Sequence, residues 1–241
     1  MSKKQQVDQR WEWVGRHNLD LEASRGRLLR GSTYKDASTV CIIPTRGVIT
    51  AKVVQSWLGL ASPMNQKFMR IFVEKMEVGD AYNAGVEMVL NNPELSKWKY
   101  ILTLEEDNCP PPDGLLKLYE HMDKFDAVGG LYWTKGENGQ PMIYGNPREM
   151  PQNFIPQIPL PDTIQPANGL GMGFTLFKTE MFRKIPKPWF RTVQEMVPGQ
   201  GMRQGTQDLM FFSEAAKYGY RFACDTRVRV GHWDAENQIM W

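Results

Sequence analysis

The apolar positions along the chain fall into short runs that alternate between two periods. Apolar runs bounded by polar or Gly/Pro-rich sequence predict buried strands at residues 39–43, 70–73, 100–104, 126–132 and 221–224. Apolar positions at helical spacing predict helices over residues 50–60, 80–91, from 112 onward and 206–218. Strands and helices that alternate in this way predict an α/β fold, with a mostly parallel sheet flanked by helices.

The second half of the chain carries a less regular pattern. A Gly-x-x-Gly turn at residues 136–139 predicts a small antiparallel hairpin. Residues 145–168 are rich in proline and polar side chains, which predicts an irregular surface connection. Residues 191–205 contain three glycines and predict a mobile segment, whereas residues 169–177 turn from glycine-rich to apolar. We therefore expect this half to complete the sheet through irregular connections.

Residues 1–38 differ from the rest and form an N-terminal basic arm that includes two tryptophans. Its basic residues are Lys3, Lys4, Arg10, Arg16, Arg25, Arg27, Arg30 and Lys35. A basic arm with aromatic side chains is suited to contact nucleic acid or another anionic partner. An amphipathic packing arm or a frayed terminus accounts for the same composition.

Composition places the 241-residue chain among ordinary soluble globular proteins, with 41% hydrophobic and 23% charged residues. The net charge of +2 gives no general sign of polyanion binding. Three widely spaced cysteines favour a reducing compartment over a disulfide framework, and they lack zinc-site spacing. We find no signal-peptide core and no apolar run near the ~20 residues that span a bilayer. We expect a cytoplasmic protein without a transmembrane segment.

A cluster of three carboxylates, Glu105, Glu106 and Asp107, follows the strand predicted at residues 100–104. Carboxylates held together repel one another unless a cation or a proton lies between them. Mg²⁺ and Mn²⁺ prefer oxygen ligands and often hold a phosphate-bearing substrate at the same time. In open α/β sheets, ligands bind at the carboxyl ends of the strands. The cluster therefore predicts a metal and phosphate site, with a solvated acidic loop as the alternative.

Two later residues are further candidates for chemistry. Asp208 falls in the first turn of the helix predicted from Thr206, where the helix dipole alone accounts for an aspartate. His232 ends an apolar run at residues 228–231, although a single histidine is commonly structural. His121, by contrast, lies among charged neighbours on a predicted helix, and we interpret it as a surface residue.

Seven short segments occur in a fixed order along residues 39–234. They are Ile42-Ile-Pro-Thr-Arg46, Ala81-Tyr-Asn-Ala-Gly85, Leu104-Glu-Glu-Asp107, Gly171-Met-Gly-Phe, Pro188-Trp-Phe190, Gln207-Asp208-Leu and Val230-Gly-His232. In this order they resemble the GT-A glycosyltransferases, particularly the family 2-like enzymes that use nucleotide-diphosphate sugars. The resemblance implies a single GT-A-like catalytic domain over residues 39–241. It would comprise a nucleotide-sugar-binding half, 39–125, and an acceptor and catalytic half, 126–241.

The resemblance implies a role for each acidic candidate. Asp107 and His232 would bind Mn²⁺ or Mg²⁺, and Glu105 would face the ribose or the water shell of the metal. Such a metal acts as a Lewis acid that neutralises charge on the leaving nucleotide. Asp208 would be the general base that takes the proton of the acceptor hydroxyl.

Contacts with the substrates follow from the same resemblance. Those assigned to the nucleotide are Thr45, Arg46, Glu74, Asn83, Glu105 and Glu106. The Gly171-Met172-Gly173 backbone would approach the donor sugar, which glycine permits. Trp133, Trp189 and Phe190 would stack on a sugar or base in the acceptor site, with plain core packing as the alternative.

Two positions depart from the family pattern, because Glu105 stands where the family has Asp and Gln207 stands where it usually has an acidic residue. We expect a metal-dependent, inverting glycosyltransferase of the hexosyltransferase type with a UDP- or GDP-sugar donor. A non-catalytic module that binds a nucleotide-sugar or glycan remains an alternative. A sugar-phosphate nucleotidylyltransferase fits less well, since residues 44–47 lack the repeated glycines of its phosphate loop. The acceptor stays open among modified DNA bases, glycans, proteins and small molecules.

Overall fold

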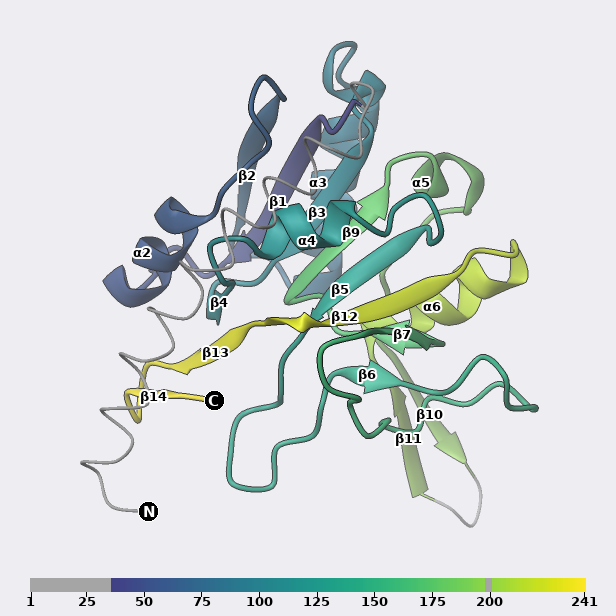
Figure 1. Cartoon of the computed structure of the whole chain (residues 1–241). Helices are drawn as coiled ribbons and strands as arrows, with labels where there is room; N and C mark the ends of the chain where they lie inside the picture. Colours follow the sequence, from purple (N-terminus) through teal and green to yellow (C-terminus); the bar gives the residue numbers. More distant parts are fainter. Residues whose placement is uncertain (1–35, 198–200) are drawn as a thin grey trace.

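The computed structural model describes residues 36–197 and 201–241 of the chain (Figure 1). The basic arm expected over residues 1–38 therefore lies outside the described residues, apart from its last three positions. No helix within the described ranges is both long enough and apolar enough to cross a bilayer. Cys41, Cys109 and Cys224 are all buried and unpaired.

A seven-stranded sheet forms the centre of the protein, in the order β2-β1-β3-β9-β5-β12-β7. Its strands in chain order are β1 (Thr39–Thr45), β2 (Phe68–Glu74), β3 (Tyr100–Leu104), β5 (Ala127–Leu131), β7 (Ile164–Ala167), β9 (Phe174–Lys178) and β12 (Phe222–Arg229). Strands β1, β2, β3, β5 and β12 run in one direction, whereas β9 and β7 run against it. The expected mostly parallel α/β sheet is confirmed, and β9 lies antiparallel between its two parallel groups.

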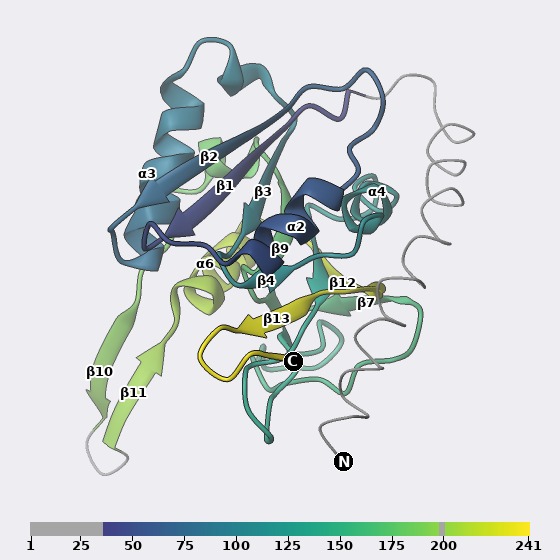
Figure 2. The same cartoon turned by 90° about the vertical axis from the view of Figure 1, so that its left-hand side faces the viewer.

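Helices cover both faces of this sheet, and the core is divided between the two faces. The helices are α2 (Ala51–Gly59), α3 (Val78–Asn91), the 3-10 turn η1 (Leu95–Lys97), α4 (Gly114–Tyr119), α5 (Met181–Lys184) and α6 (Gln207–Lys217). Apolar side chains of α3, α5 and α6 belong to one buried cluster, and those of α2 and α4 to the other. Figure 2 shows α3 and α4 on opposite sides of the sheet.

Helix α3 shows how local sequence fixes one of these contacts. Its start is capped by Glu77, whose carboxylate accepts hydrogen bonds from Gly79 N and Asp80 N. At Gly85, a Cβ atom would lie 2.5 Å from Ile42 Cγ2. Glycine therefore lets α3 pack closely against β1.

Among the described residues, segments outside the central sheet form three small antiparallel sheets. They are β4 (Asn108–Cys109) with β13 (Gly231–Asp234) and β14 (Ile239–Met240), β6 (Ile143–Tyr144) with β8 (Gly169–Leu170), and β10 (Val193–Val197) with β11 (Gly201–Gly205). The expected antiparallel region of the second half is thereby confirmed. The pairing of His232 with Asn108 brings β13 alongside the acidic cluster.

Two segments of the second half contain strands that the sequence did not predict. Residues 191–205, expected to be mobile, include the paired strands β10 and β11 on either side of residues 198–200, which lie outside the described residues. The connection at residues 145–168 is irregular as expected only up to residue 163, because it ends in β7, which pairs antiparallel with β12 as the last strand of the sheet.

Candidate active site

The carboxyl ends of β1 and β3 lie side by side at one edge of the sheet. Strand β3 ends at Leu104, and the chain turns at once into β4, with Asn108 N donating to Glu105 O at 3.0 Å. Trp233 N donates to Asp107 O at 2.7 Å and so ties β13 to this turn. The three carboxylates therefore occupy the edge where parallel sheets bind ligands.

Glu106 joins the ends of the two strands. Its carboxylate accepts hydrogen bonds from Thr45 Oγ1 and Arg46 N, both at 2.8 Å, and pairs with Arg46 Nε. Burial raises the pKa of Glu106, but the hydrogen bonds from Arg46 and Thr45 outweigh it and leave the pKa lowered. The carboxylate thus fixes the loop after β1, while the Arg46 side chain is 87% exposed and faces solvent.

One carboxylate oxygen of Asp107, Oδ2, lies close to two nitrogen atoms. Lys135 Nζ lies 2.6 Å from Asp107 Oδ2, and His232 Nε2 lies 3.3 Å from the same atom. Burial raises the pKa of Asp107, whereas hydrogen bonds from His232 and Lys135 lower it to about 2. No local pattern pointed to Lys135, which lies on the turn after β5 and reaches Asp107 only through the fold.

The orientation of His232 is set by its other ring nitrogen. His232 Nδ1 lies 2.8 Å from Trp133 O, and because a carbonyl only accepts, Nδ1 must carry the proton. Nε2 faces Asp107 Oδ2 at 3.3 Å: it donates a hydrogen bond to that oxygen when it carries a proton, and it offers a lone pair to a cation when it does not. Metal-binding histidines commonly donate their second N–H to a backbone carbonyl in this way. The pair therefore fits a divalent cation in the chemistry of its donor atoms.

Two further carboxylates share this region. Burial and the charges of Asp107 and Asp208 raise the pKa of Glu105 to about 8, with Lys135 acting in the opposite direction. Asp208 lies in the first turn of α6, as expected, and is 5% exposed. Its Oδ1 accepts hydrogen bonds from Thr206 Oγ1 and from Leu209 N at 2.8 Å. Burial raises the pKa of Asp208 in spite of these hydrogen bonds.

The glycine-rich segment is covered by side chains of this chain. A Cβ at Gly171 would lie 2.1 Å from Tyr132 Oη, and one at Gly173 would lie 2.5 Å from Asn108 Oδ1. Met172 is buried, and its carbonyl accepts a hydrogen bond from Tyr82 Oη at 3.3 Å. These glycines therefore make room for Tyr132 and Asn108, and the approach of this backbone to a donor sugar stays a prediction.

Three expected substrate contacts are structural. Trp189 and Phe190 are 4% and 1% exposed, and Phe190 stacks against Phe211 with ring centroids 4.9 Å apart. The side chain of Asn83 holds this segment: its Oδ1 accepts from Trp189 N and Phe190 N at 3.1 and 3.0 Å, and its Nδ2 donates to Phe190 O at 2.6 Å. The two aromatics therefore offer no face to an acceptor, and the Asn83 amide is already occupied.

Two other residues expected to contact a substrate, Glu74 and Trp133, are at least partly exposed. Glu74 ends β2 opposite Thr45 and is exposed. Trp133 is half-buried, with its carbonyl engaged by His232. Their contacts with a nucleotide or an acceptor stay predictions.

Sequence reasoning also missed Asn108. Its side chain is completely buried, and neither Nδ2 nor Oδ1 has a hydrogen-bond partner among the described residues. Burying an unpaired amide costs free energy, so such a group directly after Asp107 marks incomplete pairing at the site. No three His, Cys, Asp or Glu side chains in residues 36–197 and 201–241 are grouped as a complete metal site.

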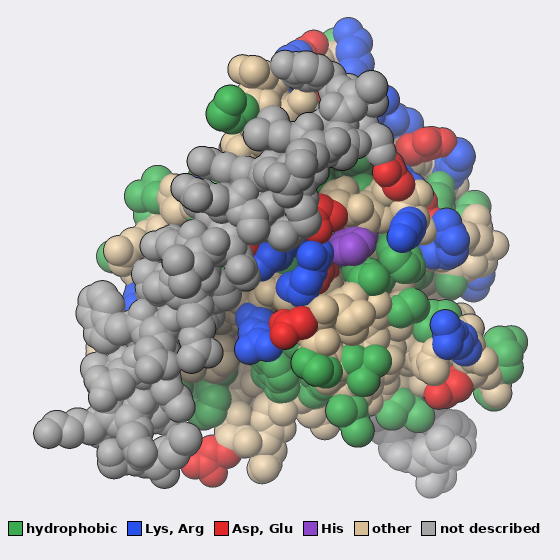
Figure 3. All heavy atoms as spheres, viewed as in Figure 1, with side chains coloured by type: hydrophobic (Ala, Val, Ile, Leu, Met, Phe, Trp, Pro, Cys, Tyr) green, Lys and Arg blue, Asp and Glu red, His purple; other side chains and the backbone are tan. Residues whose placement is uncertain are grey.

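The described part of the face seen in Figure 3 has no dominant sign of charge. Lys and Arg side chains are interspersed there with Asp and Glu, and hydrophobic side chains gather in the lower half of the view. The described part of this face thus carries no continuous basic stripe, and it adds no support for a nucleic-acid partner.

Comparison with solved structures shows a shared fold at low sequence identity. A197 from STIV matches with a TM-score of 0.59 and 20% identity, over 84% of this chain and 92% of A197. GalNAc-T7, solved with UDP, GalNAc and Mn²⁺, matches with a TM-score of 0.57 and 10% identity, over 86% of this chain. This chain spans only 46% of the GalNAc-T7 chain. No family model matches the chain, and no curated protein does.

These likenesses, together with the order and direction of the strands, show that the protein has the GT-A fold expected from its sequence. At these identities they establish the fold alone. The chemistry must therefore be argued from the side chains at the strand ends.

Proposed function

We propose that this protein is a glycosyltransferase that moves a sugar from a UDP- or GDP-type donor to a hydroxyl acceptor with the help of Mn²⁺ or Mg²⁺. The observation that carries the proposal is the meeting of Asp107 Oδ2 with His232 Nε2 at the carboxyl end of β3. A GT-A protein solved with UDP, GalNAc and Mn²⁺ shares the fold, which supports this class of donor and cation.

Asp107 and His232 would hold the cation, with Glu105 at its side. When bound, the cation supplies Lewis-acid neutralisation of the charge on the leaving nucleotide diphosphate. Glu105 is a carboxylic acid with a pKa near 8 while the cation is absent, so it can take up or release a proton as the local charge changes. Glu106 positions Thr45 and Arg46 at the end of β1, where the exposed guanidinium can reach a nucleotide.

Asp208 would act as the general base. A carboxylate takes a proton more effectively when burial raises its pKa, and burial does so for Asp208. Hydrogen bonds from Thr206 Oγ1 and Leu209 N hold one oxygen, Oδ1, and leave Oδ2 for the acceptor hydroxyl. Attack by that hydroxyl on the anomeric carbon, opposite the leaving diphosphate, inverts the sugar.

In this proposal residues 39–125, with β1, β2 and β3, bind the donor. Residues 126–241 supply Asp208, His232 and the half-buried Trp133 on the acceptor side. UDP- and GDP-sugars both fit, and the acceptor class remains open.

One observation favours a second candidate, a non-catalytic module that binds nucleotide-sugars. Lys135 already neutralises Asp107, and a complete metal site is not formed among the described residues. A protein that only binds would keep a permanent ion pair at this place. A buried base such as Asp208 is not needed for binding, which makes the transferase the stronger candidate.

Calorimetric titration with UDP, GDP, CDP and ADP, with and without Mn²⁺, tests the proposal. The wild-type protein should bind one nucleotide in a Mn²⁺-dependent way, and Asp107→Ala should lose that binding. Glu87→Ala is the matched control, since Glu87 forms an exposed ion pair with Lys187. Absence of nucleotide binding under every condition would contradict the proposal. Slow release of the nucleotide from its sugar conjugate in the wild type, absent in Asp208→Asn, separates an enzyme from a binding module.

A further inference from the structure

The ammonium of Lys135 lies at the atom that a divalent cation would need. Lys135 Nζ is 2.6 Å from Asp107 Oδ2, the same oxygen that faces His232 Nε2 at 3.3 Å. The Lys135 side chain remains 34% exposed. The free protein therefore already places one positive charge on Asp107, and that charge is attached to a flexible side chain.

We propose that Lys135 is a mobile counter-cation: it competes with the divalent metal for Asp107 in the free protein and then binds the diphosphate of the donor. The proposal rests on the proposed function and assigns a residue to it. It makes Lys135 a donor-binding residue that exchanges its contact with Asp107 for one with the diphosphate.

The turn that carries Lys135 supports such an exchange, because it is fixed without the side chain. Thr134 N donates to Gln140 O at 2.9 Å, Gln140 N donates to Thr134 Oγ1 at 2.8 Å, and Gly139 N donates to Gly136 O at 3.0 Å. Gly136 has a φ of +108°, which glycine adopts without strain. The backbone thus stays in place while the four-carbon stem of Lys135 moves its ammonium.

Electrostatic repulsion would move the Lys135 ammonium from Asp107 toward the diphosphate. Lys135 Nζ and His232 Nε2 face the same oxygen, Asp107 Oδ2. Asp107 and His232 would hold a divalent cation, and its double charge would repel the ammonium of Lys135 from Asp107 Oδ2. The partly exposed Lys135 side chain would then be available to a diphosphate bound at the site. Lysine is a common point-charge partner of phosphate.

Two affinities of each variant, one for Mn²⁺ and one for the nucleotide, test the proposal. Binding of Mn²⁺ without nucleotide is followed by the electron paramagnetic resonance signal of free Mn²⁺, and binding of UDP or GDP at saturating Mn²⁺ is followed by calorimetry. Lys135→Met should bind Mn²⁺ about three- to tenfold more tightly, because a partly exposed competitor is removed. It should bind the nucleotide about tenfold more weakly, because a charged phosphate contact is lost.

Two controls accompany this experiment. Lys135→Arg keeps the charge and should stay near the wild type in both affinities. Lys187→Met removes a lysine from an exposed ion pair with Glu87 and should change neither.

Shifts of opposite sign in Lys135→Met support the counter-cation. If the wild type shows metal-dependent nucleotide binding but Lys135→Met shifts neither affinity, or weakens both, the inference is wrong and the proposed function stands. If the wild type binds neither Mn²⁺ nor any nucleotide, the proposed function fails and the inference fails with it.

Discussion

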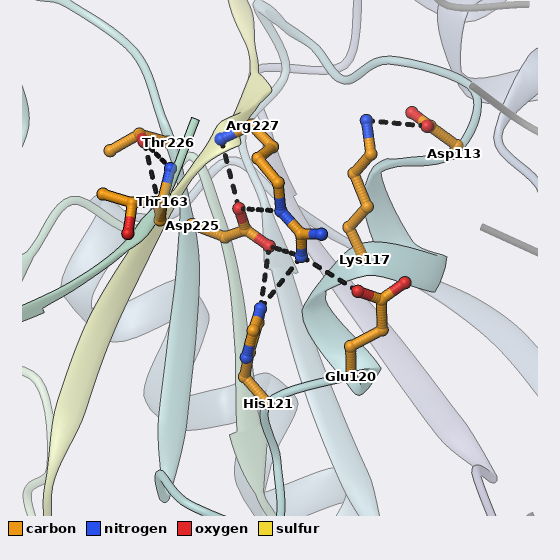
Figure 4. Close-up of polar contacts among 8 residues, drawn as sticks. All are labelled: Asp113, Lys117, Glu120, His121, Thr163, Asp225, Thr226 and Arg227. Atoms are coloured by element: carbon orange, nitrogen blue, oxygen red, sulfur yellow. Dashed lines mark hydrogen bonds and ion pairs between the residues drawn. The ribbon is translucent and has the colours of Figure 1, made fainter. Parts of the chain in front are cut away.

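Carboxylates, a histidine and a cation come together at two places in the described part of the chain, once between α4 and β12 and once beyond the ends of β1 and β3. In the first cluster, Asp225 is completely buried and accepts hydrogen bonds from Arg227 Nε at 2.9 Å and Arg227 Nη2 at 2.6 Å (Figure 4). The same guanidinium donates to Glu120 at 3.0 Å, and His121 Nε2 lies 3.3 Å from Asp225 Oδ2. The positive charge of Arg227 is thus paired with the negative charges of Asp225 and Glu120.

The cluster at the candidate site lacks this completeness. Among the described residues, Lys135 pairs with Asp107 and lowers the pKa of Glu105, and the buried amide of Asn108 has no partner. The Asp225 cluster joins α4 to β12 where the pairing of β12 with β5 shifts register after Asp225. Unsatisfied polar groups, more than the number of charges, therefore distinguish a ligand site from a structural ion network.

The largest expected effect is the loss of stability when the Asp225 cluster is broken. Asp225→Ala leaves Arg227 without its buried partner and should lower the free energy of unfolding by about 3 kcal/mol. Asp107→Ala, which relieves repulsion with Glu105, should change it by less than about 1 kcal/mol. Urea denaturation of both variants measures the difference. Equal losses of stability in the two would remove the distinction between the clusters.

The next effect concerns catalysis at the site. Asp208→Asn removes the general base while keeping the size of the side chain, and should lower turnover at least about 100-fold. The nucleotide affinity should stay near that of the wild type, because Asp208 is assigned to the acceptor. Steady-state kinetics beside calorimetry separates the two quantities. A variant with full turnover would show that another group takes the proton.

The two clusters should respond to pH in opposite directions. Burial and the neighbouring carboxylates raise the pKa of Glu105 to about 8, so the metal-free protein binds a proton there that the unfolded chain has lost, and its stability should fall as the pH rises from about 5 to 8. Burial raises the pKa of Asp225, but hydrogen bonds from His121 and Arg227 outweigh it and lower the pKa. Stability from that group is therefore present above about pH 4 and is lost as the pH falls further.

Thermal unfolding across this range, in the presence of a chelator, measures both slopes. Glu105→Gln should flatten the slope between pH 5 and 8 and leave the acid side unchanged. A slope that persists in Glu105→Gln would assign it to another group.

The smallest effect concerns Asn108 and uses Asn83 as its counterpart. Asn108→Leu removes an unpaired buried amide and should raise the free energy of unfolding by about 1 kcal/mol. Asn83→Leu removes three hydrogen bonds and should lower it by at least that amount. Chemical denaturation gives both values. Destabilisation by Asn108→Leu would mean that the amide is paired in solution, for example with water.

Much of the sheet could be predicted because its strands are short apolar runs, and β3 spans the residues expected for it. Asp208 at a helix start and His232 after an apolar run also follow from local pattern. Lys135 could not be found in this way, because the fold alone brings it to Asp107, 28 residues earlier in the chain. Local sequence likewise left Trp189 and Phe190 open between acceptor contact and core packing, and their packing against rings of α5 and α6 favours the core.

The antiparallel strand β9 has a consequence for the order in which this protein can assemble. Residues of β9 pair with β3 on one side and with β5 on the other, so the edge of β3 stays open until residue 178 has been synthesised. An open edge of a buried strand is a template for pairing with other chains. Pairing between strands this far apart in sequence also slows folding. A nascent chain that ends before β9 is therefore the species most exposed to aggregation.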